Sequence, residues 1–144
     1  MKGPARQRGA SLPETAIVIG VLLAMVFGIF DFGRAMYTYA FVAQIAREGA
    51  RWASVRGSQC SLLNNCNAGE AQIQAFVQSL SEGLTNPNNV QVAATWPACP
   101  PGLSGKTPGC TVAVSVKYPF AFLTGILPGA TILMSSTSQM VISQ

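Results

Sequence analysis

The sequence predicts an α+β protein in which a long N-terminal transmembrane helix is followed by a small helix and an antiparallel β-sheet head. Three observations predict this class. An uncharged apolar run occupies residues 15–30 of the 144-residue chain. No proline interrupts the chain from there to about Val55. After Asn88, the apolar residues change to a period of two, which is typical of strands.

Positive charge is concentrated at the N-terminus. The formal net charge is +4, from nine Lys and Arg residues against five Asp and Glu, and three of the nine are Lys2, Arg6 and Arg8. The charge belongs mostly to a short tail, so we expect no nucleic-acid partner. The sequence has no His, the commonest general base and metal ligand. It therefore predicts a protein that is not an enzyme, with no catalytic residues, no metal site and no cofactor.

The apolar run is long enough to anchor the chain in a membrane. Ala16–Phe30 is wholly apolar, and with residues 10–13 it reaches about 20 residues, the length that spans a bilayer. The uncharged core is short for this task, so the helix must tilt, thin the lipid or keep Glu14 in the apolar zone. The basic residues before the run indicate a cytoplasmic N-terminus and an outward head. We expect an aromatic belt at Tyr37, Tyr39 and Phe41.

The predicted helix continues beyond the membrane. From Leu12 to about Val55 it would be about 65 Å long. Two pairs of opposite charges are three residues apart, so each can meet on one exposed face of the helix. These pairs are Asp31 with Arg34 and Glu48 with Arg51.

Small residues are placed regularly along this helix. Gly33 and Gly49 each cost about 1 kcal/mol relative to Ala, so something must pack against them. Four others recur every fourth residue, a spacing that lets membrane helices approach closely. The alternative is the ordinary abundance of Gly and Ala in membrane helices. The four are Ala16, Gly20, Ala24 and Gly28.

The start of the helix carries a distinctive pattern. Ser11 and Glu14 form a capping box, with Pro13 in the first turn. This local explanation leaves open why a basic run ends at Gly9, five residues before the carboxylate next to the apolar run. A secretory signal would instead place its small-residue cleavage site after the apolar region.

The pattern Gly-x-x-x-x-Glu followed by an apolar stretch resembles a type IV prepilin leader. Further along, residues 31–35 (DFGRA) and 46–51 (AREGAR) resemble TadE-like pilus-assembly proteins, the pilin-like minor proteins of tight-adherence (Tad) systems. The motif residues are Asp31, Gly33, Arg34, Arg47, Glu48, Gly49 and Arg51. The resemblance implies a prepilin-type leader at 1–9, a transmembrane and extended pilin-like helix at 10–57, and a periplasmic or extracellular α+β head at 58–144.

The resemblance also implies a site of processing and assembly. A prepilin peptidase would cut between Gly9 and Ala10, and the new amine of one subunit would seek Glu14 of a neighbour. Pairing a carboxylate that is otherwise alone in apolar surroundings favours one register of assembly. Pro13, Thr15 and Ala10 depart from the usual pilin pattern, which affects subunit packing and N-methylation rather than cleavage.

The head contains four cysteines, which we expect to form disulfides in an oxidising compartment. Three pairings are possible, and the shortest loops come from joining Cys60 to Cys66 and Cys99 to Cys110. A zinc site would need four widely spaced thiolates, so we do not expect one.

The rest of the head reads as one helix and three strands. Residues 67–70 begin a helix with a capping box of Asn67 and Glu70, and residues 86–89 end it. Alternating residues then predict strands around Val90–Trp96, Val112–Tyr118 and Ile132–Ile142. The apolar loop at 119–129 contacts either the membrane surface or a partner, or else simply packs on the sheet.

The resulting functional hypothesis is a structural assembly protein: a minor pilin-like subunit (pseudopilin) needed to build a Tad-type adhesive pilus. Its expected partners are the membrane, the prepilin peptidase, other pilin-like subunits and the Tad assembly machinery. We expect it in the bacterial inner membrane as a single-pass protein, and its entry into the pilus is left open. The alternative is a single-pass anchored extracytoplasmic binding domain that the peptidase does not process.

Overall fold

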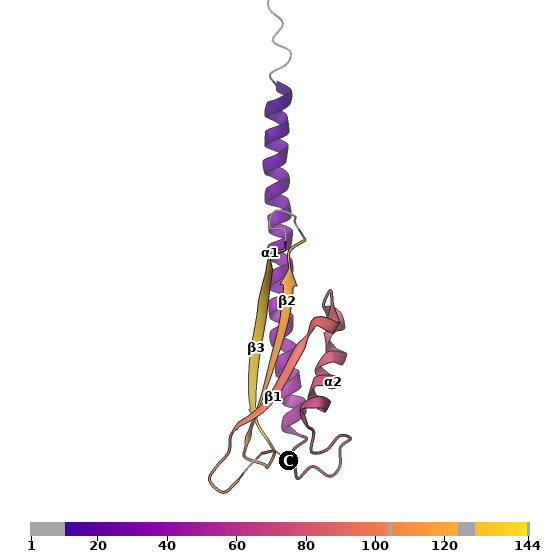
Figure 1. Ribbon diagram of the computed structural model, residues 1–144, viewed down its shortest axis with the longest axis vertical. Coiled ribbons are helices and arrows are strands. Elements are labelled where there is room, and N and C mark those ends of the chain that lie inside the picture. The colour runs from indigo at the N-terminus through magenta and orange to yellow at the C-terminus, as the bar shows by residue number, and fades with distance from the viewer. Residues whose placement is uncertain (1–10, 104, 124–128, 144) are drawn as a thin grey trace, which may run out of the picture.

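The computed structural model describes residues 11–103, 105–123 and 129–143. Its largest element is helix α1, Ser11–Ser54, which runs without interruption through 44 residues. The N-terminal half of α1 projects beyond the rest of the molecule, and the C-terminal half lies along the head (Figure 1). The structure therefore confirms one long helix that extends from the predicted membrane span into the folded head.

The head is a three-stranded antiparallel sheet with one short helix. Helix α2 is Glu70–Leu80, and two 3₁₀ turns follow it, η1 at Ser81–Gly83 and η2 at Pro87–Asn89. The strands are β1 at Gln91–Ala98, β2 at Thr111–Ala121 and β3 at Thr131–Val141. Their order is β1-β2-β3. The predicted α+β class, with a long helix, a small helix and an antiparallel sheet, is confirmed.

One face of the sheet forms the core of the head. The C-terminal half of α1 packs against β2 and β3, and α2 packs against α1 and β1. The inward residues of β2 alternate as the sequence predicts, because successive strand side chains point to opposite faces. They are Val112, Val114, Val116, Tyr118 and Phe120, all buried. The opposite face is polar around Ser115, whose hydroxyl accepts a hydrogen bond from Thr137 Oγ1 at 3.1 Å.

Gly49 allows the two helices and the sheet to meet. A Cβ atom added there would lie 2.7 Å from Cγ2 of Val77 on α2 and 3.2 Å from Cγ1 of Val114 on β2. The flanking Ala46 and Ala50 are completely buried. The expectation that something packs against Gly49 is confirmed: the absent side chain makes room for a three-element junction.

The predicted aromatic belt is wrong for Phe41. This ring is partly buried in the head, where a Cβ atom at Gly83 would lie 2.8 Å from Phe41 Cζ. Tyr37 stacks on the Phe41 ring with centroids 5.9 Å apart and stays exposed, as does Tyr39. Phe41 therefore packs against the core of the head, because η1 folds back against α1 at that level.

The capping box predicted for α2 uses other residues. Gly69 is the N-cap, and its backbone N–H donates to Oε1 of Gln72 at 2.9 Å. Asn67 lies before the helix at φ 54°, and its carbonyl accepts a hydrogen bond from Lys106 Nζ at 3.1 Å. The pairing of Asn67 with Glu70 is therefore wrong, because Asn67 belongs to the turn that precedes the helix.

Strand β3 departs from the predicted alternation at both ends. Met134 is buried, but Ile132 is 49% exposed, because an open groove lies between it and Met36 and Tyr39 of α1. At the other end, β3 stops at Val141, which is 62% exposed. Ile142 is buried beyond the strand, where its backbone N–H donates to the Cys110 carbonyl at 2.8 Å.

Both predicted disulfides are confirmed at the end of the head farthest from the N-terminus of α1. Cys60 is bonded to Cys66, and Cys99 to Cys110. The same region ends α1: the Arg56 guanidinium lies 4.2 Å above the Trp52 ring and donates to the Trp52 carbonyl at 3.1 Å. A cation at a helix C-terminus stabilises the helix dipole. The chain after β3 adds a hydrogen bond from Ser143 N to the Ser54 carbonyl at 2.9 Å.

Candidate membrane anchor and assembly surface

The N-terminal half of α1 has the properties of a membrane anchor. Every residue from 12 to 30 is exposed, although most are large and apolar. At about 1.5 Å per residue these 19 positions extend about 28 Å, close to the hydrocarbon thickness of a bilayer. Such a surface is stable only if lipid or another apolar partner covers it.

Glu14 is the one charged residue in this half of the helix. It lies in the first turn of α1 and its side chain is exposed. A carboxylate in that turn interacts favourably with the positive end of the helix dipole. The two residues of the predicted cleavage site, Gly9 and Ala10, lie outside the described residues. The side chain of Ser11, on which the first capping box depends, does so as well.

The predicted small-residue face is open along its length. A Cβ atom added at Gly20 or at Gly28 would meet nothing within 4 Å. Ala16 and Ala24, on the same face, are exposed. Within the described part of the chain, nothing packs on this stripe, so any close approach must come from another molecule.

Asp31 marks the boundary between the anchor and the head, and its environment corrects a prediction. Its Oδ1 accepts hydrogen bonds from Arg34 Nη1 at 3.4 Å and from the Leu123 backbone N–H at 3.3 Å. The Asp31–Arg34 ion pair forms as predicted, but Asp31 is only 5% exposed rather than on an open face. Arg34 also lies 5.3 Å above the ring of Phe120 on β2. The first motif therefore attaches the β2–β3 hairpin to the helix.

Gly33, within the same motif, behaves differently from Gly49. Nothing in the described structure lies within 4 Å of a Cβ atom added at Gly33, so the expected packing against it is wrong for this chain alone. The position points away from the head, and its helix-propensity cost of about 1 kcal/mol is not offset by an internal contact.

The second motif separates an inward and an outward face of α1. Ala46, Gly49 and Ala50 pack inside, whereas Arg47, Glu48 and Arg51 are exposed. Among the described residues, no ion pair joins Glu48 to Arg51, so the second predicted pair is wrong. The charges of this motif face the surroundings, and its small residues position the head.

The described residues contain no group of three His, Cys, Asp or Glu side chains that could hold a metal ion.

Two contacts could not be predicted directly from the sequence: the hydrogen bond from Leu123 to Asp31, and the stacking of Trp52 on Phe76 at 4.9 Å between ring centroids. The first joins residues far apart in the sequence. The second had a weak signal, because Phe76 is a large apolar residue within the helix predicted between residues 70 and 86.

Among the described residues, one helix is long and apolar enough to cross a membrane, and it continues into a small α+β head. This architecture fits a protein anchored by one membrane span. Residues 9–51 match the model of the family described as TadE-like protein, so this segment of the chain is similar to TadE-like proteins. The match begins at Gly9 and includes both motifs. No curated protein and no solved structure matches the chain.

Proposed function

We propose that the protein is a minor pilin-like (pseudopilin) component needed to build a Tad-type adhesive pilus. The observation that carries this proposal is Glu14, the one charged residue in the fully exposed apolar stretch 12–30 of α1, inside the segment that matches the TadE-like family. The role is structural. The chain inserts into a membrane and is assembled with similar chains, rather than acting on a substrate.

The proposed mechanism uses the N-terminal amine and the carboxylate. Cleavage after Gly9 by a prepilin peptidase leaves Ala10 as the first residue, with Glu14 one helical turn away. A carboxylate held in hydrocarbon without a partner costs several kcal/mol. The ammonium group of an incoming subunit removes this cost at one register only, so assembly selects that register.

The small-residue face supports the same role. Because nothing in the described chain covers Gly20 and Gly28, a neighbouring pilin-like helix can approach the backbone of α1 closely there. The proposed site of action is the bacterial inner membrane, with the N-terminus in the cytoplasm and the head outside it. The partners are the peptidase, other pilin-like subunits and the Tad assembly machinery.

The test compares two carboxylates on the same helix. Glu14→Ala should leave membrane insertion and cleavage largely intact but strongly reduce piliation, counted by electron microscopy of cells that carry the variant in place of the wild type. Glu48→Ala, which removes an exposed carboxylate from the head half of α1, should leave piliation unchanged. Normal piliation in the Glu14 variant would contradict the mechanism.

A second experiment separates this proposal from an anchored binding domain. If α1 served only as a tether, an unrelated membrane helix in place of residues 12–30 would preserve function. The pilin-like proposal predicts that this exchange abolishes pilus assembly even when the head is folded and membrane-bound.

A further inference from the structure

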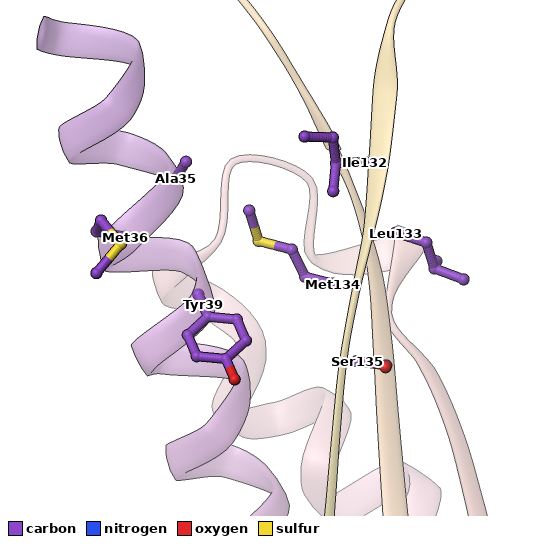
Figure 2. A pocket seen from close by; sticks show the side chains of 7 residues that line it. All are labelled: Ala35, Met36, Tyr39, Ile132, Leu133, Met134 and Ser135. Atoms are coloured by element: carbon purple, nitrogen blue, oxygen red, sulfur yellow. The ribbon is translucent and has the colours of Figure 1, made fainter.

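The hairpin of β2 and β3 ends in an exposed apolar surface beside α1. Leu123 is 74% exposed, Leu133 60% and Ile132 49%. Figure 2 shows that Ile132 and Met134 extend toward α1 and border an open groove with Met36 and Tyr39, whereas Leu133 extends to the other side of β3. Both faces of β3 are therefore apolar at this end.

This apolar character does not continue into the middle of the hairpin. The next three outward positions of β3, Ser135, Thr137 and Gln139, are polar and exposed, as expected for a face in water. Leu133 is the next outward position toward the anchor, and it is a large apolar residue where the other three are polar. Such a change from polar to apolar residues is expected where a strand passes from water into apolar surroundings.

The hydrogen bond from Leu123 to Asp31 fixes the height of this surface relative to the membrane. Asp31 follows the last residue of the exposed apolar half of α1, which is about 28 Å long and so crosses nearly the whole hydrocarbon layer. Asp31 must then lie at the membrane–water interface, on the side of the head. The 3.3 Å hydrogen bond places Leu123 at that same level.

The composition of the hairpin is compatible with lipid. Between Tyr118 and Ser143 the sequence contains no charged residue, and charge is the costliest feature to bring into a membrane. The strands remain paired up to Ala121 opposite Thr131, so the backbone polar groups that face each other across the hairpin are satisfied internally, which suits a hairpin at the membrane interface. The apolar surface is also continuous with that of the anchor, through Met36 on α1.

We propose that the end of the β2–β3 hairpin docks onto the lipid surface of the same membrane that α1 spans, through Leu123, Ile132 and Leu133. The proposal rests on the membrane anchor of the proposed function and adds a second point of attachment. The helix and the hairpin together fix the height and orientation of the head. A subunit that leaves the membrane for an assembly must release both.

The test measures lipid contact at single positions of the full-length chain. A cysteine is introduced at Leu133, labelled with an environment-sensitive fluorophore while both disulfides are intact, and reconstituted into vesicles of phosphatidylethanolamine and phosphatidylglycerol. Lipids with a nitroxide on the upper acyl chain then quench fluorophores that lie at the interface. One control carries the label at Phe27, inside the span, and the other at Leu62, which is 95% exposed in the Cys60–Cys66 loop.

The proposal predicts quenching at position 133 comparable with that at 27 and several-fold stronger than at 62. With the label moved to Leu123, Leu133→Asp should reduce the quenching, because a charge opposes entry into the interface. Quenching at 27 with none at 133 would overturn the hairpin docking and leave the anchor intact. No quenching at 27 would overturn the anchor itself. Shielding at 133 that depends on protein density rather than on the lipid quencher would show that a second chain covers the surface, contrary to the proposal.

Discussion

The two halves of α1 have the same backbone structure but opposite surroundings. In residues 12–30 every side chain is exposed, whereas in residues 31–54 one face is buried against the sheet and α2 (Figure 1). Gly49 in the second half is enclosed by Val77 and Val114, and Gly28 in the first half faces open space. The comparison shows that a small residue on α1 allows a close neighbour. That neighbour can belong to the same chain, as at Gly49, or to another molecule.

The distribution of charge follows the same division. The anchoring half has only Glu14, while the head half alternates small buried residues with exposed Arg and Glu. A helix in lipid needs no polar face, and a helix on a folded head in water does. The following predictions compare matched changes in the two halves and in the elements that they contact.

The largest difference should come from two phenylalanines. Phe120 on β2 is 2% exposed, so Phe120→Ala should lower the free energy of unfolding of the head by about 3–5 kcal/mol. Phe27 on the anchor is 51% exposed, and Phe27→Ala should leave the head unchanged. Denaturant unfolding of the full chain in detergent, followed by near-ultraviolet circular dichroism, measures both. Similar losses of unfolding free energy for the two variants would contradict the division of α1 into an exposed anchor and a half that supports the head.

A smaller difference should separate two glycines. Gly49→Ala adds a methyl group 2.7 Å from Val77 Cγ2, and we expect a net loss of about 1–2 kcal/mol after the gain in helix propensity. Gly28→Ala meets nothing within 4 Å, so it should leave the stability of the head unchanged or slightly raised. Thermal unfolding in detergent provides the measurement. An unaltered melting temperature for Gly49→Ala would show that the junction of α1, α2 and β2 can accommodate a methyl group without strain.

The smallest effect should come from the contact between the anchor boundary and the hairpin. Asp31→Ala removes the acceptor for the Leu123 N–H, and we expect a local loss of about 1–2 kcal/mol. Glu48→Ala, at an exposed position on the same helix, should change stability by less than about 0.5 kcal/mol. Hydrogen exchange at the Leu123 amide separates them: protection should fall in the first variant and persist in the second. Equal protection of the Leu123 amide in both variants would show that Asp31 does not hold the hairpin against α1.

Much of this fold could be predicted from the sequence, because its signals are local. The apolar run gives the anchor, the change of period gives the strands, and the shortest loops give the two disulfides. The Asp31–Arg34 ion pair forms as predicted, but its expected exposure was wrong, because Asp31 is covered by the hairpin containing Leu123, which follows much later in the sequence. Pattern within one helix cannot show what another segment places on it.

The candidate site divides in the same way. Glu14 and the small-residue stripe are visible in the sequence because their spacing along one helix is sufficient to find them. The opposite outcomes at Gly33 and Gly49 could not be foreseen, since the two cost the same in an isolated helix and differ only in what packs beside them. The aromatic belt predicted at Phe41 was wrong for the same reason: the contact between its ring and Gly83 joins residues far apart in the sequence.

Mass spectrometry of the N-terminus of the protein purified from cell membranes tests the central claim most directly. We predict that the mature chain begins at Ala10 when the prepilin peptidase is active and at Met1 when the peptidase is deleted. A chain that still begins at Met1 in cells with an active peptidase would contradict the account, because no ammonium group at Ala10 would then exist to pair with Glu14 of a neighbouring subunit.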